Sequence, residues 1–155
     1  MIKLQANLIT MYNGLLHAHS GLRWAVLILL LAAIFNAFSK KSNGTWRPKD
    51  KKITLFAMVF THLQLVIGLV LYFISPKVVF SDQTMGDTVL RFYAVEHIVL
   101  MLVAIALITI GYGKAKRAAS DSKKFGAVAK FYLIGLILIL ASIPWPFRNL
   151  GAGWF

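Results

Sequence analysis

Histidines stand in three of the four apolar stretches of the chain: His17 and His19 in the first, His62 in the second and His97 in the third. An ionisable side chain inside a membrane helix is energetically costly, so it usually has a partner or a function. Imidazole is an axial ligand of haem iron and also binds zinc and copper. The histidines therefore predict a haem or metal site built from side chains on different helices.

The composition predicts that the elements carrying these residues cross a membrane. The 155 residues are 59% hydrophobic and only 14% charged, and the mean hydropathy is +0.72. Because a helix crosses a bilayer with roughly 20 apolar residues, we expect transmembrane helices at 11–39, 53–75, 87–112 and 127–147. Short connections favour an all-α, up-down four-helix bundle formed as one domain by residues 1–155, with the first and third helices diagonal. The absence of cysteine excludes thiolate-held iron–sulfur clusters and covalent c-type haem.

The positive charge is concentrated in two connections. Of the 17 Lys and Arg residues, twelve lie in 40–52 and 114–130, whereas 76–86 contains only Lys77. The positive-inside rule places the two basic connections in the cytoplasm, which puts both termini outside a bacterial inner membrane. We interpret the net charge of +12 as a topology signal and an attraction to the anionic lipid bilayer, not as nucleic-acid binding.

Depth and helix rotation select among the histidines. From their outer helix ends, His19 lies at a depth of roughly 12 Å, His97 at roughly 15 Å and His62 at roughly 20 Å. His19 and His97 are thus closest in depth and on diagonal helices, where they could hold a flat macrocycle between them. Pairs that include His62 remain open. His17 is expected to point away from the face of His19, because two residues turn a helix by about 200°.

Three arginines outside the basic connections lie toward the outer helix ends: Arg23, Arg91 and Arg148. They are candidate partners for the propionates of a haem whose edge faces outward. Snorkelling at helix ends is the alternative reading of Arg91 and Arg148. Glu96, next to a histidine, is expected to pair with an arginine or to orient the imidazole.

Four segments carry a resemblance to a family. Residues 16–24 (LHAHSGLRW), 61–68 (THLQLVIG), 91–97 (RFYAVEH) and 141–148 (ASIPWPFR) resemble helices of small four-helix, cytochrome b-like membrane proteins of Bacteroidota-type bacteria. The resemblance covers nearly the whole chain. It implies that paired histidines hold haem b and that quinone is the redox partner. The chain departs from the di-haem pattern, which needs four inward-facing histidines at two depths, so we expect at most one haem.

Three hypotheses about function follow. The first is a b-type cytochrome-like protein that transfers electrons near the outer face of the membrane, with quinol as the donor. The second is a cofactor-free accessory subunit that works with other membrane subunits of a respiratory, secretion or motility complex. The third is a zinc, copper or proton site made by His19, His62, His97 and Glu96. An electron-transfer or accessory role is favoured over a stand-alone enzyme.

Overall fold

The computed structural model describes residues 2–154, with side chains described from residue 7 onward. Its four long helices are α1 (Ile2–Lys40), α2 (Pro48–Ile74), α4 (His97–Arg117) and α5 (Asp121–Ser142). The short elements are α3 (Thr88–Arg91), a π-helical segment η1 (Phe92–Glu96) that joins α3 to α4, and a 3₁₀ turn η2 (Pro146–Arg148). Four helical stretches, of 34, 27, 30 and 22 residues, are long and apolar enough to cross a membrane. The predicted all-α, up-down bundle is therefore confirmed.

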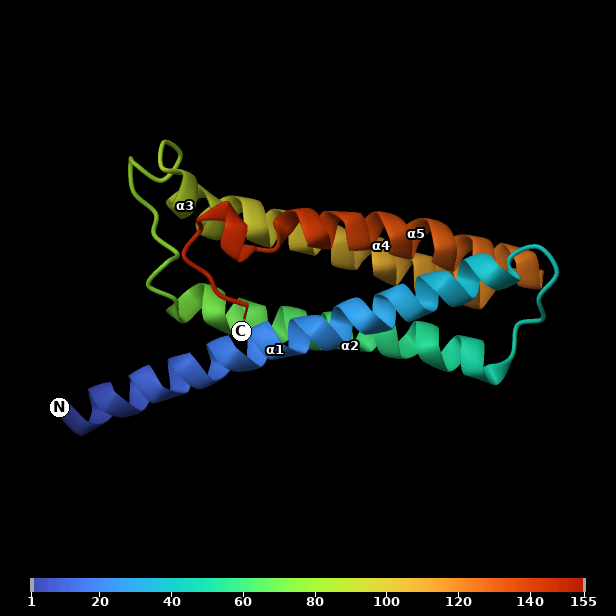
Figure 1. The fold of residues 1–155 in the computed structure, drawn as a ribbon, viewed down its shortest axis with the longest axis horizontal. Helices are drawn as coiled ribbons and strands as arrows, with labels where there is room; N and C mark the ends of the chain where they lie inside the picture. Colours follow the sequence, from blue (N-terminus) through green and yellow to red (C-terminus); the bar gives the residue numbers. More distant parts are fainter. Residues whose placement is uncertain (1, 155) are drawn as a thin grey trace.

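The helices pair into two layers (Figure 1). α1 packs along α2, and α4 packs along α5; α1 also contacts α5, and α2 contacts α4. These neighbours leave α1 and α4 at diagonal positions. The layers converge at the connection formed by residues 41–47 and diverge at the other end of the bundle, where both chain termini lie (Figure 1). We call the end that contains residues 40–52 and 114–124 the lysine-rich end, and we call the opposite end the divergent end.

Glycines allow the closest helix contacts in the bundle. A Cβ atom at Gly111 of α4 would lie 2.6 Å from the Cβ of Phe131, and one at Gly135 of α5 would lie 2.8 Å from the Cγ1 of Ile108. Because real side chains do not approach so closely, both positions require glycine for the observed packing of α4 on α5.

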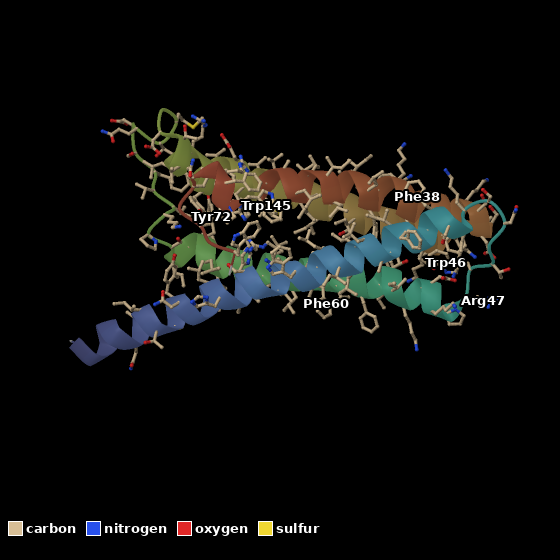
Figure 2. All side chains as sticks on the ribbon, viewed as in Figure 1. Phe38, Trp46, Arg47, Phe60, Tyr72 and Trp145 are labelled. Atoms are coloured by element: carbon tan, nitrogen blue, oxygen red, sulfur yellow. The ribbon has the colours of Figure 1, made fainter. Side chains whose placement is uncertain are left out.

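Apolar side chains cover the outside of the bundle (Figure 2). Phe35 is 78% exposed and Phe73 is 82% exposed, and Phe38, labelled in Figure 2, is also exposed. A soluble monomer rarely presents so extensive an apolar surface. Together with the length of the helices, this exterior fits a lipid bilayer.

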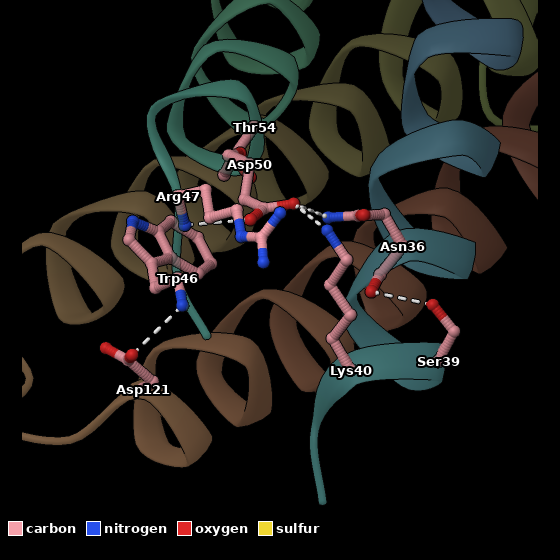
Figure 3. A network of polar contacts seen from close by, with 8 residues as sticks. All are labelled: Asn36, Ser39, Lys40, Trp46, Arg47, Asp50, Thr54 and Asp121. Atoms are coloured by element: carbon pink, nitrogen blue, oxygen red, sulfur yellow. Dashed lines mark hydrogen bonds and ion pairs between the residues drawn. The ribbon is translucent and has the colours of Figure 1, made fainter. Parts of the chain in front are cut away.

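A buried carboxylate closes the lysine-rich end (Figure 3). Asp50, only 1% exposed, accepts hydrogen bonds from Asn36 Nδ2 at 2.9 Å and from the backbone N–H of Arg47 at 2.9 Å, and it pairs with Lys40. The Arg47 bond is one half of a capping box at the start of α2, where Pro48 provides the first helical residue. The backbone N–H of Trp46 donates to Asp121 Oδ2 at 3.0 Å. These bonds tie the connection to α1, α2 and α5.

Five predicted helix boundaries are wrong, and one of them is the start of α2, which lies at Pro48 and not near residue 53. α1 begins at Ile2, not near residue 11. The predicted connection 114–130 is almost entirely helical, and only residues 118–120 lie between α4 and α5, because lysine and alanine continue a helix into water as readily as apolar residues do. The fourth long helix ends at Ser142, not near residue 147. Pro144 and Pro146 stop it, since each lacks an N–H and restricts the residue before it.

Candidate functional site

Two histidines from diagonal helices face each other near the divergent end. The imidazole rings of His19 on α1 and His97 on α4 have centroids 6.5 Å apart and an interplanar angle of 69°. Both rings line a cavity of about 220 Å³. A first-row metal ion binds an imidazole nitrogen at roughly 2 Å, so two imidazoles on opposite sides of one ion place their ring centres roughly 6 Å apart. The observed separation matches that requirement.

The position of His97 depends on the π-helical segment before it. η1 ends at Glu96, so His97 is the first residue after a widened turn. The turn is supported from α2, because the hydroxyl of Tyr72 donates to the carbonyl oxygen of Ala94 at 2.7 Å. A single π turn inside a helix rotates the residues around it and frequently occurs at functional sites.

The carbonyl of Ser142 orients the imidazole of His97. The distance between His97 Nδ1 and this oxygen is 2.8 Å. Because a carbonyl oxygen can only accept a hydrogen bond, Nδ1 carries the proton and donates it. Nε2 therefore keeps a free lone pair. Metal-binding histidines are commonly oriented by such a bond from their second nitrogen to a backbone carbonyl.

His19 lies in a space that a glycine leaves open. A Cβ atom at Gly68 of α2 would come within 2.9 Å of the Cε1 of His19. The side chain of Gln64, one turn earlier on α2, donates to the backbone carbonyl of His19 at 2.8 Å. The Nδ1 of His19 is buried and has no hydrogen-bond partner among the described residues. Since a buried polar atom rarely stays unpaired, the unpaired nitrogen marks this imidazole as a candidate ligand.

The cavity is mostly apolar and lies between the two layers. Its walls come from α1, α2 and α4, with the end of α5 and residues 151–153 completing it. Apolar side chains on these walls include Leu16, Leu65, Ile98, Met101 and Ile105. Such a lining, with a few converging polar groups, is typical of a cofactor site.

Arg23 is a buried cation at this cavity. It is 9% exposed, and its Nη2 donates to the carbonyl oxygen of Trp154 at 2.6 Å. The guanidinium lies 5.4 Å from the ring centroid of Trp24 and 5.8 Å from that of Trp145. Its Nε is buried and has no hydrogen-bond partner within the described part of the chain.

Lys77 is a second cation at the cavity, in the connection after α2. Its Nζ donates to the carbonyl oxygen of Gly151 and lies 5.0 Å from the ring centroid of Tyr93. Burial lowers the pKa of Lys77, because it penalises the charged form. An anion beside this ammonium group would offset that penalty.

The other predicted site residues lie away from the cavity lining. His62 Nδ1 lies 2.8 Å from the carbonyl of Met58 on its own helix, and Nε2 lies 3.3 Å from Thr109 Oγ1. His17 is exposed, as its helical position predicts. The structure thus brings His19 and His97 together and leaves the other two histidines apart.

Two predicted arginines and the glutamate have partners of their own. Arg91 Nε donates to Glu96 Oε1 at 2.7 Å, and both side chains are about one-third exposed. Arg148 donates to the carbonyls of Ala141 and Ile143 at 2.9 and 3.1 Å, where α5 ends. Glu96 was expected to pair with an arginine or orient an imidazole, and it pairs with Arg91.

Sequence reasoning missed Lys77, Gly68 and the Ser142 carbonyl. Lys77 looked like an ordinary loop charge. Gly68 carries no specific signal in the sequence, because its contact with His19 depends on the rotation of α2. A backbone carbonyl carries no sequence signal at all. Its role follows from Ser142 lying in the last turn of α5, beside a proline-interrupted end.

The comparisons with known proteins bring no match: no family model, no curated protein and no solved structure matches the chain. The geometry of the histidine pair and its cavity therefore carries the functional argument.

Proposed function

We propose that the chain is a b-type cytochrome-like membrane protein in which His19 and His97 would hold the iron of one haem. The observation that carries this proposal is the pair of imidazoles facing each other at 6.5 Å from diagonal helices. Haem brings four nitrogen donors of its own, so two imidazoles complete six-coordination and support one-electron transfer.

Three further features fit this ligand. Gly68 leaves room beside His19, since a Cβ there would come within 2.9 Å of the ring. The Ser142 carbonyl fixes His97 with Nε2 as the free nitrogen. The walls are mostly apolar, and Arg23 and Lys77 place positive charge at the cavity. A positive environment and low water access stabilise the reduced form of a bound redox centre.

A bare zinc or copper ion is a weaker fit. Zinc sites use three or four protein ligands. The described residues contain no group of three or more His, Cys, Asp and Glu side chains that could hold a metal. Two imidazoles at a mostly apolar cavity suit a macrocycle better than a single ion.

The orientation of the bundle sets where electrons would pass. Twelve of the 17 Lys and Arg residues lie in 40–52 and 114–130, at one end of the bundle, and the positive-inside rule assigns that end to the cytoplasm. The histidine pair lies toward the divergent end, so electron transfer would occur near the outer face of a bacterial inner membrane. A lipid-soluble quinol is the proposed donor, because it reaches an intramembrane site through the apolar exterior. Another membrane subunit is the proposed acceptor.

A visible absorption spectrum tests this function. The purified protein from haem-replete cells should show a Soret band and, after dithionite, the sharp α and β bands of a six-coordinate b-type haem. His19→Ala and His97→Ala should each remove or strongly shift these bands, while His17→Ala should leave them unchanged. Folded protein without any chromophore would contradict the proposal and favour the cofactor-free accessory subunit.

A further inference from the structure

The cavity carries positive charge that no carboxylate among its described lining residues compensates. Arg23 and Lys77 both line it, and none of its described lining residues is Asp or Glu. Three acidic side chains pair elsewhere: Asp50 with Lys40, Glu96 with Arg91 and Asp121 with Lys124. A buried cation without a counter-charge is destabilising, so this cavity favours a ligand that carries negative charge.

Both cations are held by backbone carbonyls of one short segment, residues 150–154, which we call the strap. Arg23 donates to the carbonyl of Trp154, and Lys77 donates to that of Gly151. The hydroxyl of Tyr93 donates to a third strap carbonyl, that of Leu150, at 2.9 Å. A carboxylate adds an opposite charge to its hydrogen bond with a cation, whereas a neutral carbonyl supplies no counter-charge. A carboxylate would therefore displace these carbonyls from the cations.

The strap forms one wall of the cavity. Gly151, Ala152 and Gly153 line the cavity without large side chains. Gly151 has a φ of +69°, and Asn149 before the strap has a φ of +54°, so the chain turns here in a conformation that suits glycine and asparagine. Trp154 anchors the strap by stacking on Trp24, with ring centroids 6.4 Å apart and an angle of 28°.

We propose that Arg23 and Lys77 form a binding site for two carboxylates of the cavity ligand, and that these carboxylates displace the strap carbonyls when the ligand enters. The inference rests on the proposed function, in which the carboxylates are the haem propionates. The partners of the propionates are then Arg23, which the sequence predicts, and Lys77. The strap becomes a gate that opens when haem binds.

Haem esters test the carboxylate site. The haem-free protein is titrated with protohaem and with protohaem dimethyl ester, which has the same iron and ring but no charged propionates. The wild type should bind protohaem at least about tenfold more tightly than the ester. The double variant Arg23→Gln, Lys77→Gln should lose that preference and still show the six-coordinate spectrum.

The outcomes separate the two proposals. Equal affinity of the wild type for protohaem and its ester would overturn the carboxylate site while leaving the histidine ligation intact. Failure of both compounds to bind folded protein would overturn the proposed function and this inference with it. Arg91→Gln serves as the matched control, because Arg91 pairs with Glu96 away from the cavity, and its preference for protohaem should equal that of the wild type.

Haem transfer kinetics test the strap. Trp154→Ala removes the anchor, so the rate of haem loss to excess apomyoglobin and the rate of haem uptake should both rise several-fold. Phe147→Ala is the control, since Phe147 is 71% exposed and stacks on Trp145 at the same end of the bundle. Unchanged rates in Trp154→Ala would show that the strap does not gate the cavity.

Discussion

Gly68 of α2 lies against the imidazole of His19, so close that a Cβ atom at residue 68 would stand 2.9 Å from Cε1. We expect Gly68→Ala to displace His19 and to weaken haem binding by about tenfold, and Gly68→Val to abolish it. The affinity is measured by titrating haem-free protein and following the Soret band. Alanine is a better helix former than glycine by about 1 kcal/mol, so a loss would reflect the contact and not helix propensity.

Gly21→Ala provides the matched control for that experiment. Gly21 is on the same helix as His19, but a Cβ atom there would meet nothing within 4 Å. We expect this variant to bind haem like the wild type. If Gly68→Ala also bound haem normally, the His19 ring would not need its observed position, and the proposed ligand pair would be in doubt.

The variant His62→Ala distinguishes the observed pair of His19 and His97 from the pairs with His62 that the sequence leaves open. The Nδ1 of His62 lies near the carbonyl of Met58, and its ring does not line the cavity. We expect His62→Ala to keep the six-coordinate spectrum, with a loss of stability of about 1 kcal/mol from the missing hydrogen bonds. Reduced and oxidised spectra measured beside those of His19→Ala make the comparison. Loss of haem in His62→Ala with retention in His19→Ala would reverse the assignment.

Asp50 should matter for stability and not for haem. It is 1% exposed and accepts hydrogen bonds from Asn36, Lys40 and the Arg47 backbone. Asp50→Ala leaves these donors without a partner, so we expect a loss of about 2–3 kcal/mol in the free energy of unfolding. Thermal unfolding in detergent, followed by circular dichroism, measures the change.

An exposed lysine one residue away gives the control for Asp50. Lys49 is exposed, and Lys49→Ala should unfold at the wild-type temperature. The visible spectrum of Asp50→Ala should be unchanged, since Asp50 lies at the lysine-rich end and the histidines lie toward the divergent end. A spectral change in this variant would mean that the two ends are coupled.

Membrane orientation is a separate prediction. Twelve of the 17 Lys and Arg residues lie in 40–52 and 114–130, so we expect this end to be cytoplasmic. Alkaline phosphatase fused after the last residue should be active, because it folds only outside the cytoplasm, and green fluorescent protein at the same place should be dark. The opposite pattern would invert the orientation and place the histidine pair near the cytoplasmic face.

The fold class and the order of the helices could be predicted from the sequence because they depend on local properties of the chain. Apolar runs long enough to cross a bilayer are visible in any window of the chain, and short connections leave few arrangements other than an up-down bundle. The diagonal positions of the helices carrying His19 and His97 follow from that topology. The same reasoning placed two helix boundaries wrongly around residues 114–130, because polar residues that leave the bilayer can stay helical.

The details of the site depend on the tertiary structure. The separation of His19 and His97, the orienting carbonyl of Ser142, and the strap carbonyls that hold Arg23 and Lys77 all join residues far apart in the chain. The π turn before His97 also rotates residues away from ideal helical spacing. The residue types available in each helix and their approximate depth follow from composition and the positions of the apolar runs. Which of these residues meet depends on helix rotation and backbone position. Sequence periodicity constrains the rotation only to within a turn, so packing decides the contacts.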